Sequence, residues 1–445
     1  MKNISKITFK VVIAAIFTMM TFTSCDFDEV IDPNGPSVGG VETGASLDQL
    51  NGLVVAVEST SRNGLGIETT ASGTMARELY LFDADPRNTG DLLGKNGIGL
   101  DNNSFYSTAQ WNGSYRCIKN ANVLITAVMN TEVITDTERQ GYLGFAKTFI
   151  AYELIQILKS YNIARIDVAD PDNLGPVLEF GPAMTAVRAL LDEAETNLGN
   201  AGSEFSFPLS SGFDGFTTPS TFLQFNRAVA ALAAVYDGDG SGALTDLGAS
   251  YFDLTADLTL GPKHIFSLGG GDQANPVFRI PSLSAAEPNN GDQIIVHDSW
   301  VNDAEAGDTR VTTKTATRPN PTSQDDLNGT NETRLYASNV SSIDILRNEE
   351  LILLYAEASI LANNLQDAED ALNVVRNAAG LADYSGAQTS ADLTTEMLNQ
   401  RRYSLWAENH RMFDLRRYNL SNTLPIDRTG DQIFNMFPIP LSENQ

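Results

Sequence analysis

The chain has 445 residues, with 56 Asp and Glu against 29 Lys and Arg and a formal net charge of −27. Such acidity argues against nucleic acid as a partner, since phosphate binding needs clustered Lys and Arg. It also argues against peripheral docking on anionic lipid. With 42% apolar residues, the chain is globular rather than disordered, and its length favours one large domain or two fused lobes.

The N-terminus has the pattern of an export signal. Three lysines within the first ten residues precede an apolar run from Val11 to Phe22, and two small polar residues then lead into Cys25. The run is shorter than the roughly 20 apolar residues that a spanning helix needs. We expect residues 1–24 to be a lipoprotein signal peptide and Cys25 to be the lipidated first residue of the mature chain. An ordinary secretory signal with an incidental Cys, or an uncleaved anchor, is the alternative.

The segment after Cys25 differs in composition from the rest of the chain. Residues 25–45 are rich in Asp, Gly and Pro, which predicts a flexible tether. Cleavage after residue 24 would remove three lysines and no acid, leaving 26 basic against 56 acidic side chains and a net charge near −30. With Cys25 lipidated, Cys117 would be the single free thiol, and its apolar surroundings predict a buried residue.

Apolar residues at helical spacing predict a mainly α-helical chain. The middle, residues 255–339, is interrupted by many Gly and Pro, and we expect long loops there with short strands such as Gln293–Val296. Such loops are where binding surfaces are usually placed. The predicted helices before this region begin at about Ser46 and then cover residues 111–129, 139–159, 185–198 and 222–236.

Two helices joined by a short polar turn are predicted near the C-terminus. Leu351 to Leu361 line the first, Asp367 is the expected N-cap of the second, and Gly380 ends it. Small residues at the expected contact make this a hairpin of tetratricopeptide type. A second such hairpin is predicted over residues 226–252, with 237–241 as its turn.

Several motifs, taken in order, resemble the SusD/RagB family, the surface lipoproteins of nutrient uptake in Bacteroidota-type outer membranes. No single motif is specific for this family, but the occurrence of all of them in the same order along essentially the whole chain is a strong signal. The motifs are Cys25 with its acidic followers, residues 111–115 (WNGSY), 144–147 (GFAK), 347–358 (RNEELILLYAEA), 371–376 (ALNVVR), 400–402 (QRR) with Glu408, 413–417 (FDLRR) and 437–440 (FPIP).

The resemblance implies a SusD-like helical fold over residues 46–445, a single domain in which tetratricopeptide-like hairpins form a scaffold and loops carry the ligand site. It implies a lipid-anchored protein exposed at the outer-membrane surface, and a SusC-like TonB-dependent β-barrel as its partner. The family binds oligosaccharides, or sometimes peptides, as the lid of that importer and catalyses nothing. A carboxylate-pair glycoside hydrolase and a protein-interaction scaffold are the alternatives.

Glycan-binding residues are expected on loops that combine aromatic rings with short polar side chains, because rings stack on a sugar's apolar face and polar groups bind its hydroxyls. Trp300 lies in such a polar loop, without a helical pattern around it, and is the first candidate. A second polar stretch supplies the other candidates, which are Tyr80, Phe82, Asp101, Asn102, Phe105 and Tyr106. Trp111 and Trp406 lie in helical patterns and are expected in the core.

Other motifs favour structure over chemistry. Residues 237–242 begin like a calcium loop, but Gly248 stands where the acidic twelfth ligand is needed, and Ser241 as a helix N-cap explains the segment as well. We therefore expect no cofactor, with structural calcium a weak alternative. The charged side chains of residues 401–417 have helical spacings that suit internal ion pairs and carbonyl caps.

Overall fold

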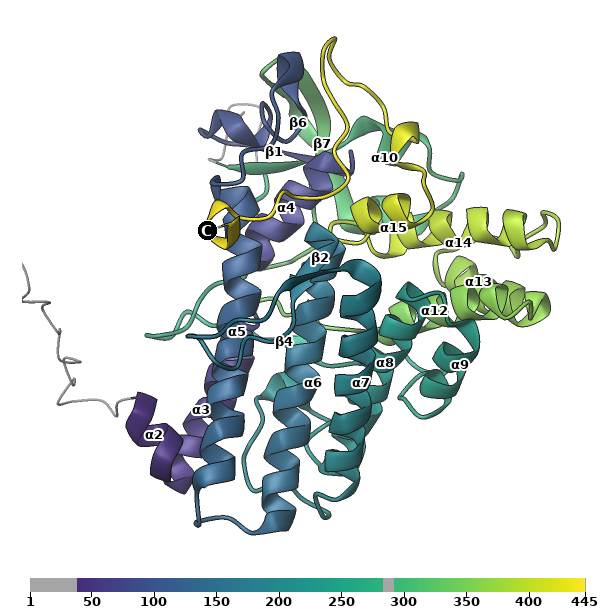
Figure 1. Ribbon diagram of the computed structural model, residues 1–445. Coiled ribbons are helices and arrows are strands. Elements are labelled where there is room, and N and C mark those ends of the chain that lie inside the picture. Colours follow the sequence, from purple (N-terminus) through teal and green to yellow (C-terminus); the bar gives the residue numbers. More distant parts are fainter. Residues whose placement is uncertain (1–37, 283–291, 445) are drawn as a thin grey trace, which may run out of the picture. The chain divides into compact units, whose positions relative to one another are not determined.

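The structure is a computed structural model that describes residues 38–282 and 292–444 (Figure 1). Contacts divide the chain into two units, Met1–Val41 and Glu42–Gln445. The predicted signal peptide, Cys25 and the first part of the predicted tether lie outside the described residues. The end of that tether, Val38–Gly44, forms helix α2.

The long helices expected from the apolar spacing form the body of the second unit, and Figure 1 shows α5, α6 and α7 side by side. Capping boxes begin three of the long helices, formed by Ser46 with Gln49, Thr135 with Glu138, and Thr218 with Thr221. Four of the observed helices, α5, α6, α7 and α8, begin three to six residues before the predicted ones. Their bounds are α3 Leu47–Thr60, α5 Phe105–Asn130, α6 Asp136–Tyr161, α7 Phe180–Gly199 and α8 Pro219–Tyr236.

Both predicted helix hairpins are confirmed. Helix α8 packs on α9 (Gly240–Gly248), and α12 (Asn348–Leu361) packs on α13 (Leu365–Ala378). Two predicted N-caps are wrong: Asn364 rather than Asp367 precedes α13, and Asp239 rather than Ser241 caps α9 by accepting from the Gly242 N–H. Helices α14 (Ser390–Ser404) and α15 (Arg411–Arg417) follow α13.

A four-stranded antiparallel sheet lies at one end of this unit, in the order β1-β5-β7-β6. Strand β5 is Gln293–Val296, as predicted, and it pairs with β1 (Leu79–Phe82). Strands β6 (Thr315–Gln324) and β7 (Leu327–Thr333) form a longer hairpin that the sequence did not predict. The prolines of β6 fall between Thr317 and Thr322, where the pairing register is interrupted, and Pro is tolerated at such irregularities.

Shorter helices and strands complete the described chain. The remaining helices are α4 Leu65–Met75, α10 Asp298–Asn302 and α11 Thr309–Lys314, and the remaining strands are β2 Ile163–Arg165, β3 Val177–Glu179, β4 Lys263–His264 and β8 Ile343–Asp344. The 3-10 turns are Pro86–Asn88, Lys95–Gly97, Ser211–Phe213, Ser421–Thr423 and Leu441–Asn444. The mainly α fold class is confirmed.

The core holds the side chains that were expected to be buried. Cys117, Trp111 and Trp406 are at most 2% exposed. Within residues 38–282 and 292–444, no helix combines the length and apolar character that a membrane crossing requires.

Candidate functional site

Four of the five rings predicted to contact glycan are buried. Trp300 is 0% exposed, Tyr106 1%, and Tyr80 and Phe82 4% each. A ring can stack on a sugar only through an accessible face, so the prediction that these four are exposed is wrong. In the described part of the chain, every aromatic side chain is buried or half-buried.

Trp300 belongs to the core beneath the sheet. Its ring packs against Tyr403 and Trp406, with 5.1 Å between ring centroids in both pairs. Its indole Nε1 donates to the Arg402 carbonyl at 3.1 Å. Helix α10, which carries Trp300, has only five residues, too few for a helical period to appear in the sequence.

The buried candidates at the other stretch hold the sheet and a neighbouring loop in place. Tyr80 and Phe82 lie on β1 and pack with buried residues of β5 and β7. The Tyr106 hydroxyl donates to Asp91 at 2.8 Å and accepts from the Asp101 backbone N–H at 2.8 Å. Its contact therefore orders the loop that carries the two polar candidates.

Three of the predicted residues remain at the surface together. Asp101 is exposed, and Asn102 and Phe105 are half-buried. The Arg87 guanidinium lies over the Phe105 ring, 4.7 Å from its centroid. We call Arg87, Asp101, Asn102 and Phe105 the Phe105 patch. It offers one half-exposed ring beside polar groups, the combination expected for sugar binding.

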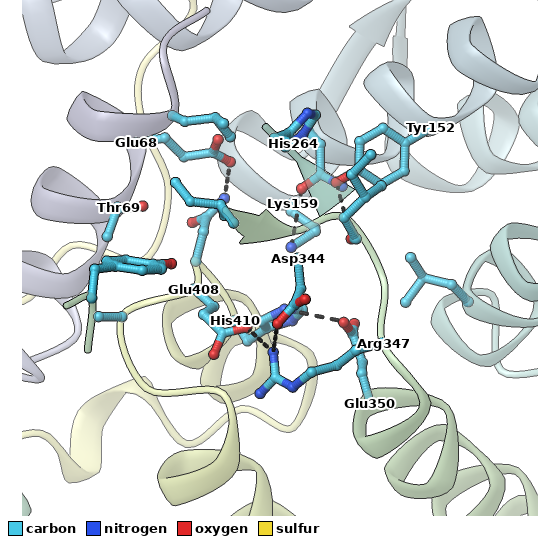
Figure 2. Close-up of a pocket in the computed structure, with 18 residues that line it drawn as sticks. Glu68, Thr69, Tyr152, Lys159, His264, Asp344, Arg347, Glu350, Glu408 and His410 are labelled. Carbon is cyan, nitrogen blue, oxygen red and sulfur yellow. Dashed lines mark hydrogen bonds and ion pairs between the residues drawn. The ribbon is translucent and has the colours of Figure 1, made fainter. Parts of the chain in front are cut away.

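A small polar cavity lies in the interior, between α4, α6, α12 and the segment before α15 (Figure 2). Its volume is about 60 Å³. Ligand pockets typically measure about 300–1,000 Å³, so this space is too small for a sugar ring. The labelled side chains come from segments far apart in the sequence, and include Glu68, Lys159, Glu350 and His410.

Arg347 is the most extensively paired of the charged side chains at this cavity. Arg347 pairs with Glu349 at 2.9 Å, contacts Glu408, and donates to the Ser404 carbonyl at 2.7 Å. Burial raises the pKa of both Glu68 and Glu350 to about 7, while nearby Lys159 acts in the opposite direction. We interpret this cluster as a structural connection between the N-terminal and C-terminal parts of the fold.

The charged side chains near the C-terminus have the structural roles predicted for them. Arg401 pairs with Asp414 at 2.7 Å, and Arg417 pairs with both Glu357 at 2.6 Å and Asp414 at 2.9 Å. Arg416 donates to the Leu158 and Lys159 carbonyls at 3.0 and 2.9 Å, near the end of α6. The predicted ion pairs and carbonyl caps are confirmed.

A larger groove opens at the surface along the C-terminal half of α3, with a volume of about 440 Å³. We call it the α3 groove. Arg62 pairs with Asp272 at 2.9 Å, and its guanidinium lies 5.5 Å from the centroid of the Phe266 ring. Both oxygens of the Glu58 carboxylate lie within 3.3 Å of the Ser210 backbone N. The other lining residues include Val55, Pro208, Leu209, Phe213, Lys263, His264 and Ile265.

Sequence reasoning did not identify the α3 groove. Glu58 and Arg62 are four residues apart in the chain, a spacing that signals a charged pair and no more. Their other partners, Ser210 and Asp272, come from loops about 150–210 positions further along the chain. Only the folded chain brings them together.

A second groove, of about 380 Å³, lies beside the C-terminal segment. Leu100 and Phe437 contribute apolar walls, and Asn162 and Glu179 contribute polar groups. Because Leu100 directly precedes Asp101 in the chain, this groove borders the loop of the Phe105 patch.

The calcium-like segment binds an arginine. Asp237 and Asp239 pair with Arg188 at 2.7 and 2.5 Å, in the turn between α8 and α9. In the described ranges, no three His, Cys, Asp or Glu side chains gather in a way that could hold a metal ion.

Comparisons with known proteins agree on one fold. The SusD family model matches residues 293–444. A SusD superfamily protein from Bacteroides vulgatus ATCC 8482 is 16% identical, with 90% of this chain and 97% of that chain covered and a TM-score of 0.67. Curated protein sequences contain no match.

Two further solved structures carry names that describe their binding. Surface glycan-binding protein A from Bacteroides fluxus is 15% identical, with 88% of this chain and 95% of that chain covered and a TM-score of 0.68. Surface glycan-binding protein A from Bacteroides thetaiotaomicron, in complex with laminarihexaose, is 17% identical, with 89% and 97% covered and a TM-score of 0.67. The resemblance seen in the sequence motifs is confirmed.

Proposed function

We propose that this SusD-family protein, with the SusD fold along most of its length, captures oligosaccharides or polysaccharides outside the cell and delivers them to a SusC-like TonB-dependent barrel. The observation that carries this proposal is the shared fold with surface glycan-binding proteins, one of them in complex with laminarihexaose. Lipid on Cys25 would hold the protein at the outer-membrane surface beside that barrel.

The described side chains favour a binding protein over an enzyme. His264 and His410 are 4% and 6% exposed, and His297 is held by Asp427 at 3.0 Å. None of the three offers an accessible general base. The buried carboxylates around the interior cavity have no space beside them for a sugar ring. Two of the structures named above are surface glycan-binding proteins, which also favours binding.

The Phe105 patch is the proposed glycan contact that remains from the sequence prediction. Phe105→Ala should weaken binding about twofold to tenfold, because aromatic contacts contribute about 0.5–1.5 kcal/mol beyond area burial. Calorimetry against laminarihexaose, maltohexaose, cellohexaose and xylohexaose measures it. The exposed Val133→Ala is a matched control. Equal affinities for Phe105→Ala and wild type would exclude the patch, and reducing ends released by pure wild-type protein would favour a hydrolase instead.

The proposed partner and anchor are tested in the native membrane. After mild detergent extraction, the protein should co-purify with a barrel-sized companion, and its absence would contradict the lid role. A Cys25→Ala variant should still bind glycan in solution but support poor uptake by cells. Normal uptake with a fully released protein would contradict the proposed use of the anchor.

A further inference from the structure

The α3 groove has the size and wall composition of a ligand site. Its volume of about 440 Å³ falls within the range of about 300–1,000 Å³ typical of small-molecule pockets. One wall is apolar and partly accessible: Val55 is 57% exposed, and Leu209 and Ile265 are half-buried. A convergent set of a few polar groups completes such sites.

Those polar groups are held in position by the fold. Arg62 donates to the Ser59 carbonyl at 3.3 Å and to the Ile265 carbonyl, and it pairs with Asp272 at 2.9 Å. Its side chain is only 12% exposed. Glu58 is fixed by the Ser210 N–H, but a carboxylate has about four lone-pair sites, and one N–H occupies only part of them.

A buried polar atom without a partner also occurs here. His264, which is 4% exposed, lies between the α3 groove and the interior cavity and lines both, and its Nε2 atom has no hydrogen-bond partner among the described residues. Burial together with the nearby Arg62 charge lowers the pKa of His264 to about 3, so the imidazole is neutral at physiological pH. A neutral imidazole can hydrogen-bond a hydroxyl as donor or acceptor.

The charges of the groove select against an anionic ligand. Glu58 and Asp272 place two carboxylates on its walls, and the one arginine between them is already paired. Lys263, the other cation, pairs with Asp344 at 2.6 Å. Both cations among the described lining residues are thus held by carboxylates, so an anion would find no free positive charge there, whereas hydroxyl groups can donate to the carboxylates.

We infer that the α3 groove is a glycan subsite separate from the Phe105 patch. It takes a neutral sugar ring with its apolar face against Leu209 and Ile265 and its hydroxyls bonded to Glu58 and Asp272. This inference rests on the proposed function, from which it takes the ligand class. The groove lies on α3 and two loops, and it shares no lining residue with the Phe105 patch.

The test fills the groove from its exposed wall. Val55→Trp places a large ring into the groove from a surface position and should weaken binding at least tenfold in calorimetry against the four hexasaccharides named above. Met129→Trp is the matched control, since Met129 is 58% exposed on α5 and does not line the groove. Glu58→Gln keeps the shape and removes the carboxylate, and we expect a loss of about threefold to tenfold. Thermal unfolding confirms that each variant is folded.

The outcomes separate the inference from the function. If wild type and Met129→Trp bind a hexasaccharide and Val55→Trp binds it more weakly, the groove is supported. If Val55→Trp and Glu58→Gln bind like wild type, the groove is excluded while the proposed function stands. If wild type binds none of the four glycans, the proposed function fails, and the groove inference is overturned with it.

Discussion

At the scale of single residues, the sequence neighbours of Trp300 led to a wrong prediction of its exposure. His, Asp, Ser and Asn around it are typical of a surface loop, yet the ring is 0% exposed. These polar neighbours have a local role. The His297 ring accepts a hydrogen bond from the Ser299 backbone N–H at 3.1 Å and so caps the start of α10. Burying a Trp also requires a partner for its indole N–H, and the Arg402 carbonyl supplies it.

Trp300→Ala is therefore expected to reduce stability rather than affinity. Loss of a fully buried Trp side chain costs about 3–5 kcal/mol of unfolding free energy. Urea denaturation measures this loss, and Trp300→Phe, which keeps most of the apolar volume, should lose less. A Trp300→Ala protein that unfolds like wild type but no longer binds glycan would show that the ring contacts ligand after all.

At the scale of helices, two glycines of the family-like motifs mark places where segments touch closely. A Cβ at Gly113 of α5 would clash with the Asn63 carbonyl oxygen and lie 2.9 Å from the Asn63 carbonyl carbon. A Cβ at Gly144 of α6 would lie 2.5 Å from Leu198 Cγ of α7. At both positions glycine allows a neighbouring segment to approach closely.

Gly113→Ala should destabilise the protein, because Asn63 opposes it with backbone atoms, which cannot rotate away. Overpacking of this kind costs about 1–3 kcal/mol. Gly52→Ala is the matched control, since Gly52 lies inside α3 and a Cβ added there would have no neighbour within 4 Å. It should gain up to about 1 kcal/mol of stability from the higher helix propensity of Ala. Thermal and urea unfolding measure both, and equal effects would contradict the close packing.

At the scale of the whole described chain, the interior charge cluster joins segments that are distant in sequence. Glu68 lies on α4, Lys159 on α6, Glu350 on α12 and His410 just before α15. Figure 2 shows them around one small cavity. Because burial raises the pKa of Glu68 from 4.5 to about 7, the folded protein binds a proton that the unfolded chain releases in this interval.

Stability should therefore fall as pH rises from about 4.5 to 7 through Glu68. Its contribution is fully present below pH 4.5 and lost above the folded pKa, a change of ~3 kcal/mol for this shift. In Glu68→Gln this part of the pH dependence should disappear, so the variant gains stability relative to wild type as pH rises. Urea unfolding at pH 5 and pH 8 measures it, with the exposed Glu132→Gln as control. Parallel pH profiles for Glu68→Gln and wild type would contradict the assignment.

The long helices, both hairpins, strand β5 and the buried Cys117 could all be predicted, because each leaves a local signal in periodicity, capping residues or turns. The β6–β7 hairpin could not, since its prolines signal a loop unless the partner strand and the interrupted register are known. Nor could the ion pair between Asp239 and Arg188 of α7, because the two residues are 51 positions apart and meet only in the folded chain.

The sequence by itself determined the fold class, the family resemblance and the acidic character of the chain, because local periodicity, motif order and composition are properties of the chain alone. Only the tertiary structure decided which candidate rings are accessible. Accessibility depends on what packs against a side chain. Trp300 donates to the Arg402 carbonyl and Glu58 accepts from the Ser210 N–H, and both partners lie about 100 positions or more away in the sequence. For this reason the groove along α3 became visible only in the folded protein.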